Sequence, residues 1–205
     1  MPQATDHLLL FTRYPQPGQS KTRLIPCLGA RGAAELQRRM TEQLMAQLRE
    51  LPVGRIGITI HYEGGDSEAM GKWLGSFAYE RQAQGSLGAR LRQAFALAFA
   101  AGARRAVVIG SDCPALTSAH ILAAFAGLTK HELVLGPATD GGYYLLGLRR
   151  PEAELFAAMP WGREELLART VEKATALKLA TLFLEPLSDV DRPEDLHHFR
   201  YHPHP

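Results

Sequence analysis

Three groups of charged side chains follow strands that the sequence predicts, each at the point where a strand ends. The first group is basic and the other two are acidic. In chain order they are Arg13 with Lys21-Thr22-Arg23-Leu24, then Asp112, and finally Asp189 with Asp191. Ligands of open α/β sheets bind beyond the carboxyl ends of the strands, so these groups are expected to converge. A basic loop facing carboxylates indicates a metal-bound nucleotide.

Asp112 has the strongest case for binding a cation. It follows an apolar predicted strand directly, and Pro114 then turns the chain. A carboxylate placed there points to the carboxyl edge of the sheet, and Mg²⁺ takes one or two carboxylates together with phosphate oxygens. Helix capping is the alternative role, but Thr117 or Ser118 can cap the next helix instead. We therefore place metal binding ahead of capping.

The basic loop reads Pro15-Gln16-Pro17-Gly18 between Arg13 and Lys21. Pro and Gly are ordinary turn residues, and Lys and Arg are mostly exposed, so a plain turn with solvated charges is the alternative. The loop stands just before a predicted helix, whose N-terminal amides would also favour an anion. It is not a Walker A loop, which needs Gly-x-x-x-x-Gly-Lys-Ser/Thr.

Two further segments are candidates for substrate or metal contact. The turn Asp140-Gly141-Gly142 lies between two strands and is a hairpin signal by itself, yet paired glycines also let a ligand approach the backbone. Tyr143, Tyr144 and Trp161 would wall an acceptor pocket, although aromatic strand residues are usually core. In the segment 189–193, one aspartate would cap the helix expected from Pro193 and leave the other free for a metal.

Composition narrows the class of protein. The 205 residues are 46% hydrophobic and 21% charged, as expected for one domain with its own core. The net charge of +2 comes from 23 basic and 21 acidic residues mixed along the chain, so no nucleic-acid partner is expected. No segment approaches the ~20 apolar residues of a membrane span. Two cysteines make no disulfide framework, so we expect a reduced, cytoplasmic protein.

Short apolar runs alternate with longer amphipathic ones, which predicts an α/β fold with a mostly parallel central sheet flanked by helices. The expected strands are His7 to Thr12, Arg55 to His61, Ala78 to Gln82, Arg105 to Ile109, Glu132 to Gly136, Tyr143 to Leu148 and Ala180 to Leu184. The expected helices are Arg31 to Leu51, Leu87 to Ala101, Ser118 to Phe125, Glu164 to Ala176 and Pro193 to Phe199.

The histidines and cysteines do not indicate a metal site or a nucleophile. Four histidines, His197, His198, His202 and His204, lie near the chain end among prolines, where we expect a mobile His/Pro-rich tail, 197–205, after a single domain, 1–196. Cys113 is interpreted as a small buried residue, because no His stands near it in the sequence.

Taken together, the four motifs resemble a known family. Lys21-Thr22-Arg23-Leu24, Gly110-Ser111-Asp112-Cys113-Pro114, the segment 136–144 and Asp189-Val190-Asp191-Arg192-Pro193-Glu194-Asp195-Leu196 are similar to those of the bacterial transferases named for association with radical enzymes and selenodomain proteins. That family is catalogued as a domain of unknown function. The resemblance covers nearly the whole chain and implies the nucleotide-diphospho-sugar transferase (GT-A) fold. Phospholactate guanylyltransferases and the molybdenum-cofactor guanylyltransferase are similar in their motifs.

The resemblance also implies roles for single residues. Arg13, Lys21 and Arg23 would hold the nucleotide phosphates, with Lys21, Arg23 and Asp112 as the catalytic groups. Asp112, Asp189 and Asp191 would hold Mg²⁺ or Mn²⁺. Gln84, Gly85, Leu87 and Gly88 would lie near the base or ribose. Apart from the resemblance, the glycine turn and its aromatic neighbours indicate acceptor contacts by Asp140, Gly141, Gly142, Tyr143 and Trp161. The first loop departs from the Gly-Gly pair of the molybdenum-cofactor enzyme, so base contacts there are expected to differ.

Three functions stay open at this point. The leading one is a metal-dependent nucleotidyltransferase that moves NMP from an NTP to a small phosphorylated or carboxylated acceptor and releases pyrophosphate. Asp112 stands alone rather than in the Asp-x-Asp of typical sugar-transferring enzymes, which favours this chemistry. The alternatives are a glycosyltransferase with a nucleotide-sugar donor and a non-catalytic nucleotide-binding protein. The base, the acceptor and the oligomeric state, a homodimer among them, are not identified by the sequence.

Overall fold

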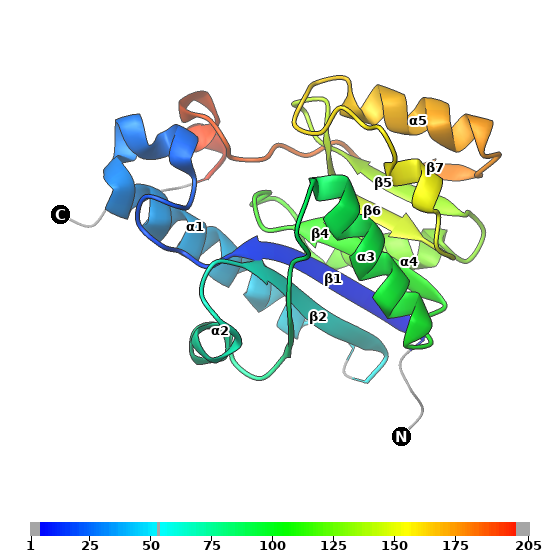
Figure 1. Cartoon of the computed structure of the whole chain (residues 1–205), viewed down its shortest axis with the longest axis horizontal. Coiled ribbons are helices and arrows are strands. Elements are labelled where there is room, and N and C mark those ends of the chain that lie inside the picture. Colours follow the sequence, from blue (N-terminus) through cyan, green and yellow to red (C-terminus); the bar gives the residue numbers. More distant parts are fainter. Residues whose placement is uncertain (1–4, 53, 200–205) are drawn as a thin grey trace.

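The computed structural model describes residues 5–52 and 54–199 (Figure 1). Its strands form a seven-stranded sheet in the order β3-β2-β1-β4-β6-β5-β7. The strands are β1 (Asp6–Arg13), β2 (Ile56–Glu63), β3 (Ala78–Arg81), β4 (Arg105–Gly110), β5 (Leu133–Pro137), β6 (Tyr143–Leu148) and β7 (Thr181–Phe183).

Only β6 runs against the other strands of this sheet. The pairs β1–β2, β1–β4, β2–β3 and β5–β7 are parallel, whereas β6 is antiparallel to both β4 and β5. The hairpin predicted at 136–144 therefore forms. The parallel strands bring the carboxyl ends of β1, β2 and β4 to one edge, which is where the charged motifs begin.

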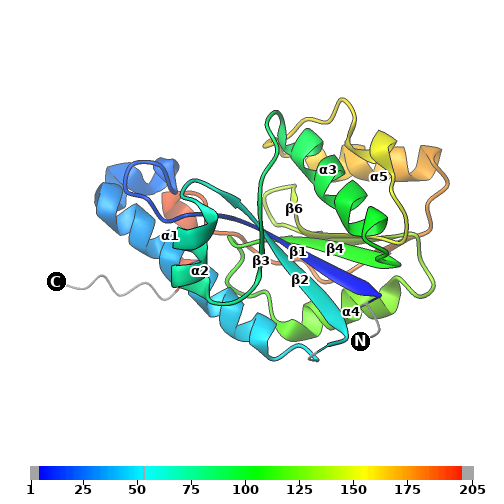
Figure 2. The ribbon, with the colours of Figure 1, turned by 60° about the horizontal axis from the view of Figure 1, so that its bottom comes forward.

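Helices cover both faces of the sheet, as the alternating pattern predicts. In Figure 2, α3 and α5 lie on one face and α1 and α4 on the other. The helices are α1 (Ile25–Arg49), α2 (Ser67–Leu74), α3 (Leu87–Ala100), α4 (Ser118–Gly127) and α5 (Leu166–Ala176). Three short 3₁₀ turns join them: η1 (Thr22–Leu24), η2 (Ala153–Phe156) and η3 (Pro193–His198).

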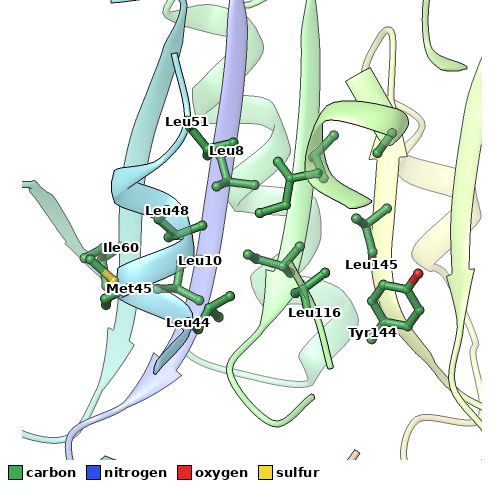
Figure 3. Packing of buried hydrophobic residues seen from close by; sticks show 14 of the residues in the cluster. Leu8, Leu10, Leu44, Met45, Leu48, Leu51, Ile60, Leu116, Tyr144 and Leu145 are labelled. Carbon is green, nitrogen blue, oxygen red and sulfur yellow. The ribbon is translucent and has the colours of Figure 1, made fainter. Parts of the chain in front are cut away.

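The two faces of the sheet bury separate cores. Leu8 and Leu10 of β1 pack with Leu44 and Leu48 of α1, and neighbouring Leu9 points to the opposite core under α3. Figure 3 shows the first of these clusters, where the α1 leucines lie over the strands. Successive β1 residues are buried on both sides, which is why this strand reads as a continuous apolar run.

Most expected elements are present, with three differences. The helix expected from Arg31 is preceded by one more turn, because Gly29 has φ 69 and joins two helical pieces across a kink. Helix α2 was not predicted; Asp66 caps it by accepting from the Ala69 amide at 2.8 Å. The helix expected at Pro193 to Phe199 is the 3₁₀ turn η3.

Three residues of the expected tail, 197–199, lie within the described residues. His197 and His198 belong to η3, and Phe199 packs against the apolar cluster at the start of α1. Residues 200–205, with His202 and His204, lie outside the described residues, so the division at residue 196 stays a prediction. Among the helices that the structure describes, none is both long and apolar enough to cross a membrane.

Candidate functional site

A cleft of about 670 Å³ opens at the carboxyl ends of β1, β2 and β4. It gathers residues from all three charged motifs, although up to 178 positions separate them in the chain. Those lining it are Arg13, Lys21, Arg23, Asp112, Asp189 and Asp191. The structure thus brings together the side chains that the sequence placed at strand ends.

Lys21 lies at the centre of this arrangement. Its side chain is only 4% exposed, and its Nζ is 2.8 Å from Asp112 Oδ1 and 2.8 Å from Asp191 Oδ1. It also donates to the Val190 carbonyl oxygen at 2.7 Å. Burial alone would lower the pKa of Lys21, but the two carboxylates outweigh it and raise the pKa. Lys21 is therefore a charged counter-ion held between two of the predicted metal ligands.

The segment 189–199 is fastened to the rest of the site by backbone and apolar contacts. The Val190 amide donates to the Asp112 carbonyl oxygen at 2.9 Å. The Val190 side chain is fully buried among residues of η1 and α1, including Leu24 and Leu36. Figure 1 shows η3 beside the start of α1. These contacts hold the second acidic motif against the first.

Asp195, not Asp189 or Asp191, caps the turn that begins at Pro193. Its Oδ2 accepts from the amides of Asp191 and Arg192 at 3.1 and 2.7 Å. The expectation that one aspartate of the pair serves as the cap is therefore wrong, because Asp195 satisfies those amides. Both Asp189 and Asp191 keep their side chains for the cleft. Likewise Thr117 stands at the N-cap of α4, so Asp112 is not needed there.

Carboxylates crowd this end of the cleft. Burial, and then the negative charges of Asp140, Asp191 and Asp112, raise the pKa of Asp189 to about 6. Burial would also raise the pKa of Asp191, but Lys21, Arg23 and Arg192 hold it below the ordinary value. Such mutual repulsion favours a bound cation.

The carboxylates suit a hard cation only if a ligand supplies further oxygens. Within residues 5–52 and 54–199, no three acidic, His or Cys side chains are grouped closely enough to hold a metal by themselves. Asp112 and Asp191 are joined by Lys21 instead. Mg²⁺ commonly takes one or two carboxylates plus substrate phosphates, and the oxygens present fit that mode.

Two arginines and a glutamate line the other end of the cleft, at the ends of β1 and β2 and on α3. Glu63 Oε2 accepts from Arg13 Nη2 at 2.7 Å and from Arg90 Nη1 at 3.1 Å. Arg13 and Glu63 are directly opposite in the β1–β2 register. Burial would raise the pKa of Glu63, but the two arginines keep it lowered. Sequence reasoning missed Glu63 and Arg90, which look like ordinary surface charges.

A buried polar network lies beneath the cleft and joins α1 to β1 and β4. Gln37 is 4% exposed, and its Nε2 donates to Ser111 Oγ at 3.0 Å and Thr41 Oγ1 at 3.1 Å. Thr12 Oγ1 lies 3.0 Å from Ser111 Oγ. Ser111 immediately precedes Asp112, so the network fixes the backbone that carries this carboxylate. Only the spacing of Gln37 and Thr41 on the buried face of the helix could have pointed to it.

Some of the predicted acceptor residues line the cleft, and others lie outside it. Asp140 and Gly142 line the cleft, where Asp140 Oδ1 accepts from the Gly142 amide at 2.8 Å. Gly141 has φ 87, and a Cβ there would meet the Glu164 carbonyl oxygen at 2.1 Å, so this glycine is needed for packing. Trp161 lies outside the cleft lining and lines a separate hollow with Arg163.

The two tyrosines face different cores. Tyr143 packs edge-on against Trp161, and burial raises its pKa. Tyr144 is buried in the cluster of Figure 3 and donates its hydroxyl hydrogen to the Glu185 carbonyl oxygen at 3.1 Å. Both tyrosines also line the cleft, so the core position of Tyr144 does not remove it from the predicted pocket wall. Cys113 is buried as well, and burial raises its pKa to about 12.

Of the segment expected near the nucleobase, too, only part lines the cleft. Leu87 lines the cleft and is 42% exposed. Gly85 contributes its carbonyl oxygen, which accepts from Arg90 Nε at 3.1 Å. Gly88 is buried under Trp161, where a Cβ would lie 2.7 Å from Trp161 Nε1. Gln84 is exposed in the loop before α3 and is not part of the cleft lining.

Solved structures share this fold. A candidate nucleotide-diphospho-sugar transferase of Desulfovibrio desulfuricans G20 is 33% identical, with a TM-score of 0.86 over 92% of this chain and 83% of that one. A CMP:2-keto-3-deoxy-manno-octonic acid synthetase complexed with CTP is 12% identical, with a TM-score of 0.56 over 94% and 95%. Glucosyl-3-phosphoglycerate synthase of Mycobacterium tuberculosis, solved with Mn²⁺, UDP and glucosyl-3-phosphoglycerate, is 13% identical, with a TM-score of 0.54 over 94% and 74%.

These structural neighbours are transferases, and the fold is that of the nucleotide-diphospho-sugar transferases, as the motif resemblance implied. The last two, at 12% and 13% identity, bear on the fold alone. No curated protein matches the sequence. The model of one family, described as "uncharacterized protein conserved in bacteria (DUF2064)", matches residues 34–163. With more than half of its length matched by that model, the chain belongs to the DUF2064 family.

Proposed function

We propose that this protein is a metal-dependent nucleotidyltransferase that moves NMP from an NTP to a small phosphorylated or carboxylated acceptor. One observation carries the proposal: Asp112 and Asp191 are joined through Lys21 in a cleft that also presents Arg13 and Arg23. Carboxylates for a cation and guanidinium groups for phosphates therefore share one cleft. The cleft lies where ligands of open α/β sheets bind.

The chemistry needs no protein nucleophile. An acceptor oxygen forms a bond to the α-phosphorus, and the bond from that phosphorus to the bridging oxygen breaks, so pyrophosphate leaves with the electron pair. A divalent ion held by Asp112 and Asp191 would neutralise charge on the phosphate oxygens. Arg13 and Arg23 would orient the phosphate chain, and positioning with electrostatic stabilisation would supply the rate enhancement.

The test begins with thermal unfolding of the purified protein against each NTP and common nucleotide-sugars, with and without Mg²⁺ or Mn²⁺. A ligand of the native state raises the melting temperature as its concentration exceeds Kd. A metal-dependent rise with an NTP, followed by pyrophosphate release with an acceptor, supports the proposal. A rise with nucleotide-sugars alone would instead indicate glycosyl transfer, and tight binding without any product would indicate a binding protein.

Asp112→Asn tests the metal role directly. Replacing a carboxylate with an amide removes the charge but keeps the size, so we expect pyrophosphate release to fall at least about 100-fold, as when a charged transition-state contact is removed. Glu68→Gln, an exposed position on α2, is the matched control and should keep full activity. Unchanged metal-dependent turnover in Asp112→Asn would refute the assignment.

A further inference from the structure

The cleft has two chemically different ends. One end carries the carboxylates and Lys21, where the metal and phosphates are proposed to bind. The other end, at the carboxyl ends of β1 and β2, combines charged groups with an apolar wall. That wall consists of Phe11, Leu87 and Leu91, and the charged groups are Glu63 and Arg90. Arg13, proposed above to orient the phosphates, lies between the two ends, because β1 stands between β2 and β4 in the sheet. A nucleotide extended along the cleft would place its flat base at this second end.

Glu63 and Arg90 leave one acceptor and one donor there without a protein partner. Glu63 Oε2 is shared by Arg13 and Arg90, whereas Glu63 Oε1 makes no hydrogen bond within the part of the chain that the structure describes. Arg90 uses Nε and Nη1 on Gly85, Glu63 and Gln82, and its Nη2 likewise has no partner in that part. Glu63 is 39% exposed, so a ligand can reach it.

The pair is held in place before any ligand arrives. Gln82 Oε1 accepts from Arg90 at 3.2 Å, and Gln82 Nε2 donates to the carbonyl oxygens of Thr12 and His61 at 3.2 and 3.0 Å. This orients the Gln82 amide, because its nitrogen faces two carbonyl oxygens and only its oxygen is left for the arginine. Fixed groups of this kind discriminate between ligands more strongly than mobile ones.

We propose, on the basis of the proposed function, that Glu63 and Arg90 select a nucleotide whose base carries an exocyclic amino group. The amino group donates to Glu63 Oε1, and Arg90 Nη2 donates to the acceptor beside it on the base. Cytosine presents this pattern through its amino group and N3. Uracil presents the reverse, a carbonyl oxygen toward the carboxylate and an N–H toward the guanidinium. Leaving such charged groups unpaired in a cleft is what makes the wrong base bind weakly.

The experiment measures Kd by calorimetry for three matched pairs of nucleotides in the presence of Mg²⁺: CTP with UTP, ATP with ITP, and GTP with ITP. The two nucleotides of each pair differ at an amino group. The pair whose two members differ in Kd identifies the base. We expect the amino-bearing member of that pair to bind about tenfold or more tightly, the effect of one hydrogen bond to a charged group. The wild-type comparison requires no variant to fold.

Glu63→Gln then tests the residue. Its amide can turn either way and offer an acceptor or a donor, so the ratio within the selected pair should fall to about twofold or less. Glu80→Gln on β3 is the control and should keep the wild-type ratio, since Glu80 is exposed and does not line the cleft. The melting temperature of Glu63→Gln confirms that it is folded.

The outcomes separate this inference from the function on which it rests. Metal-dependent binding with equal affinities within all three pairs overturns the base selection and leaves nucleotidyl transfer standing. An unchanged ratio in Glu63→Gln overturns the role of Glu63. Failure of every nucleotide to bind overturns the proposed function, and this inference with it.

Discussion

The Lys21 ammonium donates to three oxygens, one from the loop after β4 and two from the segment 189–191. All three of its hydrogens are therefore engaged without a ligand. The residue has φ 47, a conformation uncommon for a side chain other than glycine, which the surrounding contacts maintain. Its structural task is to hold the carboxylates in place. Of the three cations predicted to hold phosphates, Arg23 is the most exposed, at 60%.

Lys21→Met should therefore destabilise the protein even without ligands. Methionine keeps the length of the side chain but leaves Asp112 and Asp191 facing each other, so we expect the free energy of unfolding to fall by about 1–3 kcal/mol. Arg23→Met is the matched control: Arg23 is 60% exposed and 3.5 Å from Asp191, so its change should stay within about 0.5 kcal/mol. Urea unfolding measures both. Equal, small changes would show that Lys21 does not hold the site together.

Some residues of the cleft could be predicted from the sequence, and others could not. The positions of Asp112 and Asp191 at the edge of the sheet could be predicted because each comes after a strand at a chain turn, whereas their roles stay predictions. The site position of Glu63 could not be predicted. It depends on the pairing of β1 with β2, which places Glu63 opposite Arg13 and which no local sequence pattern specifies. The role of Gln37 could not be predicted for a related reason. A polar residue on a buried helix face has a role only if it contacts polar groups on other elements, here at the ends of β1 and β4.

At the scale of elements, two helical glycines should respond oppositely to alanine. A Cβ on Gly88 of α3 would lie 2.8 Å from the Phe156 carbonyl oxygen, so Gly88→Ala should lower the free energy of unfolding by about 1–3 kcal/mol. A Cβ on Gly71 of α2 meets only Tyr79, at 3.9 Å, so Gly71→Ala should raise it by about 0.5–1 kcal/mol. Denaturant unfolding followed by tryptophan fluorescence measures both, and changes of the same sign would contradict this packing.

Strands and long helices were predictable because burial repeats along them. The fourfold spacing of leucines in α1 and the apolar run of β1 both specify their elements locally. The short helix α2 was missed because its apolar positions are few, although Asp66 is a residue type that favours the N-cap of a helix. The antiparallel direction of β6 followed from the hairpin turn, whereas its place between β4 and β5 depends on long-range pairing that no local pattern specifies.

At the scale of the whole molecule, stability should fall in mild acid because of His61. Burial, and then the charge of His7, lower the pKa of His61 to about 4. Native His61 thus stays neutral while the unfolded chain takes up a proton below about pH 6.5, so unfolding becomes easier as pH falls from there toward 4.

His61→Phe removes this proton uptake and keeps the ring that stacks on Phe11. Between about pH 7.5 and pH 5, wild type should lose about 2 kcal/mol of unfolding free energy more than the variant. Urea titrations at the two pH values give the difference. Parallel losses in the two proteins would mean that His61 does not titrate as its burial requires.

The contacts of Lys21 with Val190 and Asp191 join positions 169 and 170 residues apart. Contacts this distant in sequence close a long loop, and the entropic cost of that closure must be met before the contacts can form. The strands around β1 can therefore pair before the cation-binding end of the cleft exists. During refolding, competence to bind the metal and nucleotide should lag behind the appearance of secondary structure, so ligand binding reports complete folding and not the formation of the sheet alone.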